Sequence, residues 1–340
     1  MAGSARAHDE RAEGRHTRPT KGRAAALGVA RLLLLRALEA ALVLVLLASL
    51  VFLAMRLLPG DPAALVLGDQ ADPAELARLR AQLGLDRPLY VQYAHFLRGL
   101  PTLDLGDSIR RPGTPASARV LAALGPTAEL AGVAVLFGSV VGIGLAVLGA
   151  GPWLGRRRAW VDRAVTAVAG VPLLSFAPVL TYALAARLRW VPLPGDPEAG
   201  ALGTLYASAL LSIPLGMQVA RIGRAALEDV GRAPFLAVAR AKGKSRLGAW
   251  LVHAVPAASG PLVTVIATQL GALLGGAVVL ERLFERAGLG TLILEAYASR
   301  DLPVLEAGVV AAGGLFVVTQ MLAALAHAAI DPRAREGGGR

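Results

Sequence analysis

The sequence predicts an all-α integral membrane protein with six transmembrane helices. Its mean hydropathy is +0.57 and 55% of its 340 residues are hydrophobic, more than a water-soluble domain usually carries. Long apolar segments recur along the chain, near the length of roughly 20 residues that a helix needs to cross a bilayer. Basic residues gather between alternate segments, as in the loops of membrane proteins. The expected spans are 37–58, 129–151, 164–186, 202–219, 263–280 and 304–327.

Residues 1–36 precede the first span and are predicted to form a disordered basic tail. They hold eight Lys/Arg against three acidic residues and lack apolar periodicity before about Leu27. A basic start followed by an apolar run also marks a secretory signal peptide. This run continues into "PGDPA" rather than a small-x-small cleavage site. We therefore favour an uncleaved signal anchor.

The net charge of +11 fits either nucleic-acid binding or basic cytoplasmic loops, and its distribution decides between them. Six spans place both termini on one side of the membrane. With the N-terminus inside, the inner segments carry 22 of the 35 Lys/Arg, including all three lysines, against eight Asp/Glu. The positive-inside rule then gives an N-in/C-in topology, with 331–340 as a cytoplasmic C-terminus. The basic excess sets topology, so we expect no nucleic-acid partner.

The first outside loop, 59–127, is long and polar, and we expect it to be folded. Asp72 is a plausible N-cap, with Pro73 at the first position of a helix in "DPAELARLRAQLGL". "RPLYVQYAHFLRGL" has the spacing of a second short amphipathic helix. These signals predict an extracytoplasmic cap rather than a linker.

Glycines and prolines interrupt the later spans. Pro172, within the predicted span 164–186, is one such helix breaker. Inside a membrane, neighbouring helices can satisfy the backbone groups that a breaker leaves free. The motifs Gly138-x-x-x-Gly142 and Gly271-x-x-x-Gly275 would permit close contact between helices.

The Gly-Lys-Ser at 243–245 is not a phosphate-binding loop. That motif needs a glycine five residues earlier, between a strand and a helix, but Val238 stands there and the preceding segment has helical character. Residues Ala233–Lys242 instead predict a short amphipathic helix on which Phe235, Leu236 and Ala239 share a face, ended by Gly243. Two roles fit this helix equally well: lying on lipid headgroups, or docking a soluble partner.

Several ordered motifs resemble the binding-protein-dependent ABC importer permeases, and more narrowly the first-of-pair type of the dipeptide/oligopeptide/nickel permease family. The general signature of the cytoplasmic loop begins Glu-Ala-Ala, whereas here Ala237 replaces the glutamate, as is common in the peptide branch. The matching segments, in chain order, are "MRLLPGDPA", "LGLDRPLYVQYAHFLRG", "LDLGDSI", "GPTAEL", "LEDVGRAPFLAVARAKGKSRLGAWLVHAVPAASGP", "ERLFERAGLGTLILEAYASRDLPVLEAG" and "DPRARE".

The resemblance implies a type I ABC importer permease fold, with the ABC transmembrane type-1 domain over 120–330. It implies a multi-pass protein of the bacterial inner membrane that is not an enzyme, because ATP hydrolysis resides on two separate ABC ATPase subunits. The other implied partners are a second homologous permease, an extracytoplasmic substrate-binding protein and membrane lipid. The cytoplasmic loop 221–260 would couple to the ATPases through Glu228, Phe235, Ala239, Arg240, Lys242, Gly243, Lys244 and His253.

The residues give no sign of catalytic, metal or cofactor chemistry. The chain has no cysteine, and the histidines outside the tail are far apart. Glu39, Glu129 and Glu306 lie in the spans but near their ends, where solvation or pairing with a basic neighbour is expected. A secondary transporter is the alternative, although it usually needs inverted repeats or midplane charges. Peptides, glutathione and nickel chelates all remain open as substrates.

Overall fold

The computed structural model describes residues 21–57, 60–68 and 72–330, and this part of the chain is all-helical. An isolated β-bridge joins Asp107 to Pro115. The elements are α1 (Lys21–Leu57), α2 (Pro62–Leu67), α3 (Pro73–Gln82), α4 (Leu89–Gly99), η1 (Leu100–Thr102), α5 (Ala116–Ala150), η2 (Gly155–Arg157), α6 (Arg158–Ala169), α7 (Leu173–Thr181), η3 (Tyr182–Arg187), α8 (Gly200–Gly231), α9 (Pro234–Ala241), α10 (Arg246–Ala249), η4 (Trp250–Ala254), α11 (Val255–Ala257), α12 (Ser259–Leu283), α13 (Leu289–Ala298) and α14 (Leu302–Ile330).

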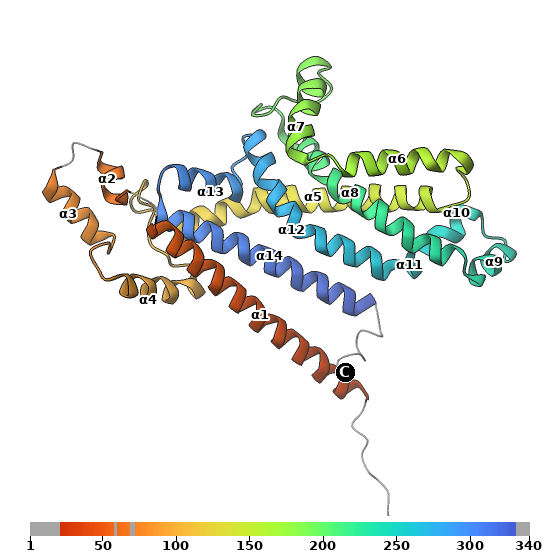
Figure 1. The fold of residues 1–340 in the computed structure, drawn as a ribbon, viewed down its shortest axis with the longest axis horizontal. Coiled ribbons are helices and arrows are strands. Elements are labelled where there is room, and N and C mark those ends of the chain that lie inside the picture. The colour runs from red at the N-terminus through yellow and green to blue at the C-terminus, as the bar shows by residue number, and fades with distance from the viewer. Residues whose placement is uncertain (1–20, 58–59, 69–71, 331–340) are drawn as a thin grey trace, which may run out of the picture.

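The long helices form an elongated bundle with short helices at both ends (Figure 1). Helices α2, α3, α4 and α13 lie at one end, called here the cap end. Helices α9, α10 and α11 lie at the opposite end, called here the loop end, and the start of α1 and the end of α14 are directed the same way. Within the described residues, α1, α5, α8, α12 and α14 are long and apolar enough to cross a membrane.

The predicted third span, 164–186, is wrong as a single helix. The chain instead forms α6, a break at Gly170–Pro172, α7 and then the π-helical turn η3. Figure 1 shows α7 rising steeply from the direction of α6. Pro172 explains the break, because it lacks an N–H and restricts the backbone of the residue before it.

Three other boundaries differ from the expectation. Residues 21–36 were placed in the disordered tail but form the start of α1, while 1–20 lie outside the described residues. Residues 116–127 belong to α5 rather than to the loop before it. Helix α8 continues to Gly231, beyond the predicted end at 219. The extensions at 21–36 and after 219 are rich in good helix formers, whereas the extension at 116–127 continues through Gly125 and Pro126.

The cap has the two helices that the sequence predicts. Asp72 accepts a hydrogen bond from Ala74 N at 3.1 Å and Pro73 occupies the first turn, which confirms the start of α3. Helix α4 packs on α1 through Phe96, whose ring centroid lies 5.1 Å from that of Phe52. The hydroxyls of Tyr93 and Ser49 are 2.6 Å apart beside this contact. The cap is therefore attached to the end of the first long helix.

Helices α5 and α8 approach so closely that side chains are excluded between them. A Cβ on Gly138 would lie 2.4 Å from Leu215, and one on Gly142 would lie 2.6 Å from the carbonyl oxygen of Gly216. This confirms the first glycine motif. The second is confirmed in part, because a Cβ on Gly271 would lie 2.4 Å from Phe316 while Gly275 faces open space.

Candidate functional site

Helix α9 is the short helix predicted at the loop end, and both of its ends follow the sequence signals. Pro234 occupies its first turn. Gly243 has φ +85°, and its N–H donates to Arg240 O at 2.9 Å while Lys244 N donates to Ala239 O at 3.2 Å. This pair of bonds is the Schellman motif, which requires the left-handed conformation that glycine adopts without strain.

The buried face of α9 differs from the predicted one. Leu236 and Ala239 are buried, but Phe235 is 42% exposed and Val238 is 53% exposed. Ala239 therefore packs inside the protein and is not available for close approach by a partner. Leu236 and Ala239 belong to the same core cluster as Trp250, which makes an edge-on contact with Trp153 at 5.5 Å between ring centroids.

The polar candidates of the loop separate into exposed and internal groups. Arg240, Lys242, Gly243 and Lys244 are all exposed on or after α9. With Phe235 and Val238 they form one exposed segment, which we call the α9 surface. His253 is half-buried in the π-helical turn η4.

Glu228 lies near the end of α8 and is engaged within the protein. It forms ion pairs with Arg158 of α6 and with Arg224 of its own helix, whose Nε donates to Glu228 Oε1 at 2.7 Å. Arg224 also pairs with Asp162 of α6. This network fastens α6 to α8 at the loop end, so Glu228 positions the loop rather than forming part of the α9 surface.

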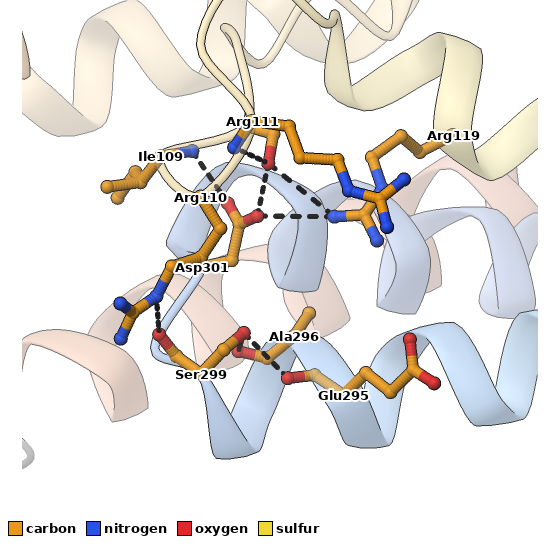
Figure 2. Close-up of polar contacts among 9 residues, drawn as sticks. Ile109, Arg110, Arg111, Arg119, Glu295, Ala296, Ser299 and Asp301 are labelled. Atoms are coloured by element: carbon orange, nitrogen blue, oxygen red, sulfur yellow. Dashed lines mark hydrogen bonds and ion pairs between the residues drawn. The ribbon is translucent and has the colours of Figure 1, made fainter. Parts of the chain in front are cut away.

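A buried polar cluster holds the cap end together (Figure 2). Asp301, with no exposed area, accepts hydrogen bonds from the hydroxyl of Ser108 and from Ile109 N, and pairs with Arg119 of α5 at 3.3 Å. Beside it, Arg110 Nε donates to Ser299 O at 2.8 Å. The loop after η1, α5 and the start of α14 therefore meet at one carboxylate.

A second buried carboxylate caps α13. Glu281 accepts hydrogen bonds from Gly290 N at 2.8 Å and Thr291 N at 3.2 Å, two of the N–H groups in the first turn that have no partner within the helix. Thr127 of α5 donates its hydroxyl to Glu281 at 2.5 Å and accepts from Leu289 N at 2.7 Å. The negative charge at a helix N-terminus adds a favourable dipole interaction.

The three carboxylates considered from the sequence are all paired. Glu306 is buried and pairs with Arg56 of α1. Glu129 pairs with Arg286 at 3.2 Å, and Glu39 with Arg36 at 2.9 Å on the exposed face of α1. Asp301 and Glu281 were not singled out, although both lie in the quoted segment 281–308, where five acidic residues stand beside apolar ones.

These clusters bind the helices to one another and offer no reactive arrangement. Within the described ranges, no group of three or more His, Cys, Asp or Glu side chains could hold a metal ion. The carboxylates are occupied by basic, hydroxyl or backbone partners. These clusters therefore hold the helices in position relative to one another.

Comparison with known proteins gives the family. Residues 138–336 match the family model "Binding-protein-dependent transport system inner membrane component", and residues 29–110 match the model of the N-terminal part of such membrane components. The chain therefore belongs to this family of transport permeases. It is a multi-pass protein of the inner membrane and an ABC importer permease.

Individual relatives agree over nearly their whole length. The chain is 32% identical to the probable peptide ABC transporter permease protein y4tP of Sinorhizobium fredii, over 84% of this chain and 93% of the relative. It is 36% identical to the glutathione transport system permease protein GsiC of Salmonella typhimurium, over 86% of this chain and 94% of that relative. A solved structure of the MetNI methionine ABC transporter in inward-facing conformations matches with a TM-score of 0.51 and 18% identity, over 62% of this chain and 96% of that one. That last likeness supports the fold.

Proposed function

We propose that this permease forms half of an ATP-driven import pathway for short peptides and that the α9 surface docks an ABC ATPase subunit. The single observation that carries the docking role is the exposure of Phe235 and Val238 on a helix whose opposite face, Leu236 and Ala239, is packed in the core. Apolar side chains flanked by Arg240, Lys242 and Lys244 suit a partner groove with an acidic rim. A rigid helix is needed if it is to transmit movement of the ATPase.

The topology follows from this assignment. The loop end would face the cytoplasm and the cap end the outside, with both termini inside, as the distribution of Lys/Arg predicts. The broken segment α6–α7–η3, third in chain order, would then bring the number of membrane crossings from five to six. The cap, with α2, α3 and α4, would receive a substrate-binding protein, and a second permease would complete the pathway.

The substrate class rests on the relatives. One is named for peptides and the other for glutathione, which is itself a tripeptide. We propose a short peptide delivered by the binding protein. Hydrolysis of ATP would reside on two partner ATPase subunits, so this chain would perform no catalysis.

The test is co-purification of the tagged chain from native membranes in mild detergent. The docking variant is Val238→Asp, which puts a charge on the α9 surface. The matched control is Tyr90→Asp, at a side chain that is 75% exposed on the cap. We expect the ATPases to be recovered with the unmodified chain and the control but lost with Val238→Asp. Recovery with all three variants would overturn the docking site, and recovery with none would overturn the assembly.

A further inference from the structure

A cavity of about 360 Å³ lies between the break that separates α6 from α7 and the middle parts of α8 and α12. Its wall includes Gly170 and Pro172 from the break between α6 and α7, Pro214 of α8 and Gln269 of α12. Gln269 is the eleventh of the 25 residues of α12, and Pro214 the fifteenth of the 32 residues of α8. If these helices cross the bilayer, the cavity is at its midplane.

The break places the start of α7 at this cavity, because Pro172 and Leu173 line it. Helix α7 begins at Leu173 with Pro172 as its N-cap, and no side chain caps it. On α8, Pro214 cannot donate the helical hydrogen bond to the carbonyl of Leu210. Irregular backbone at membrane depth is tolerated only where it is buried in protein or lines a hydrated cavity.

Gln269 supplies a side chain for this cavity. It is half-buried, and its amide makes no hydrogen bond to any residue in the described part of the chain. The other lining residues are mainly apolar, and in such surroundings the amide gains from a cavity ligand that hydrogen-bonds to it. The carboxamide offers both a donor and an acceptor, which is the complement of a peptide group.

We propose that this cavity is a subsite of the translocation pathway in which Gln269 binds a backbone amide of the peptide in transit. The proposal rests on the function proposed above and names a residue that contacts the substrate. No charged side chain lines the cavity, so the site suits a neutral amide rather than a peptide terminus. Such a contact tolerates many peptide sequences, because every peptide carries the same group. The volume is within the range of small-molecule sites.

The experiment uses the complete transporter reconstituted in liposomes. The test variant is Gln269→Leu, which keeps the approximate size and removes the amide. The matched control is Gln320→Leu, on α14 and away from this cavity. We expect Gln269→Leu to lower uptake of trialanine about tenfold, the effect of one well-formed hydrogen bond, with ATP hydrolysis and subunit recovery kept. The control should transport like the unmodified protein.

A direct readout comes from the absence of native cysteine, since Ala272→Cys would add a single thiol to this chain, in the cavity wall. Millimolar trialanine should slow its alkylation by N-ethylmaleimide when Gln269 is present and not when leucine replaces it. An ester analogue of the peptide, which lacks one N–H, should protect less.

Equal protection in both backgrounds, or a thiol that never reacts, would overturn the subsite. Uptake by Gln269→Leu equal to that of Gln320→Leu would overturn it too. Failure of the proposed function is distinct: the unmodified transporter would then import no trialanine and recover no ATPase, and the alkylation assay would still report on the cavity.

Discussion

Asp301 accepts a hydrogen bond from the backbone N–H of Ile109 at 3.0 Å, across 192 positions of sequence. The same buried carboxylate pairs with Arg119 at the start of α5. One side chain at the beginning of α14 therefore holds the last loop of the cap and a long helix of the bundle. Movement of α14 at the cap end would therefore carry this loop with it.

Replacing Asp301 with alanine should destabilise the protein strongly. Arg119 is only 15% exposed and would lose its counterion, and Ile109 N would lose its acceptor. Removing one partner of a buried pair costs about 3 kcal/mol. Thermal unfolding in detergent measures the loss, with Glu295→Ala as the control because Glu295 is exposed on neighbouring α13. Equal stability of the two variants would contradict the role given to Asp301.

The glycines of α5 give a matched pair on one helix. Gly138→Ala would place a Cβ 2.4 Å from Leu215 and 2.9 Å from the backbone oxygen of Ser212, whereas Gly144 has no atom within 4 Å. We expect Gly138→Ala to cost about 2 kcal/mol through overpacking. Gly144→Ala should be neutral or stabilise the helix by up to about 1 kcal/mol. Thermal unfolding of both variants under the same conditions would show whether close contact of α5 and α8 is the cause.

Features of the fold that depend only on residues close together in the sequence could be predicted from it. The start of α3 at Asp72 and the end of α9 at Gly243 follow from capping residues within one turn of helix. The break at Pro172 could not be read from hydropathy, because a window average spans it. A proline two residues after a glycine was the available signal, but packing against neighbouring helices can also accommodate such a pair without a break.

The site was predicted less completely, for a related reason. The amphipathic pattern of α9 predicted a buried face that includes Phe235, but only Leu236 and Ala239 are packed in the core cluster, which also contains Trp250 of the following segment. Asp301 and Glu281 have partners 193 and 154 positions away, so their roles exist only after folding. A single sequence shows where the acidic residues stand but not which distant residues will be their hydrogen-bond and ion-pair partners.

Glu281 should control the order of α13 specifically. Glu281→Leu removes the acceptor of Gly290 N and Thr291 N at the start of that helix, with each lost bond worth about 1 kcal/mol or more. We expect hydrogen exchange in α13 to become faster while exchange in the middle of α8 stays unchanged. Glu281→Gln keeps one acceptor oxygen, so its rate of hydrogen exchange in α13 should lie between those of the unmodified protein and of Glu281→Leu.

Gly288→Ala tests the same contact from the other side. Its Cβ would lie 2.1 Å from the carboxyl carbon of Glu281 and must displace it. The exchange pattern should therefore match that of Glu281→Leu. Uniform acceleration over all helices would instead indicate global destabilisation and no particular role at α13.

Glu228 and Lys244 should separate positioning from docking. Glu228 is 28% exposed and pairs with Arg158 of α6, while Lys244 is exposed beyond α9. Glu228→Gln should lower the free energy of unfolding by about 1 kcal/mol, less at high salt, because its pairs are partly solvated. It should still recover the ATPase subunits when purified from membranes.

Lys244→Glu should do the reverse. An exposed charge reversal leaves stability within about 0.5 kcal/mol but repels an acidic partner surface. We expect normal thermal unfolding with loss of the ATPases, and partial recovery of binding in an ATPase carrying a compensating basic residue. If Glu228→Gln alone lost the ATPases at unchanged stability, Glu228 would contact the partner directly, and the α9 surface would have to extend to the end of α8.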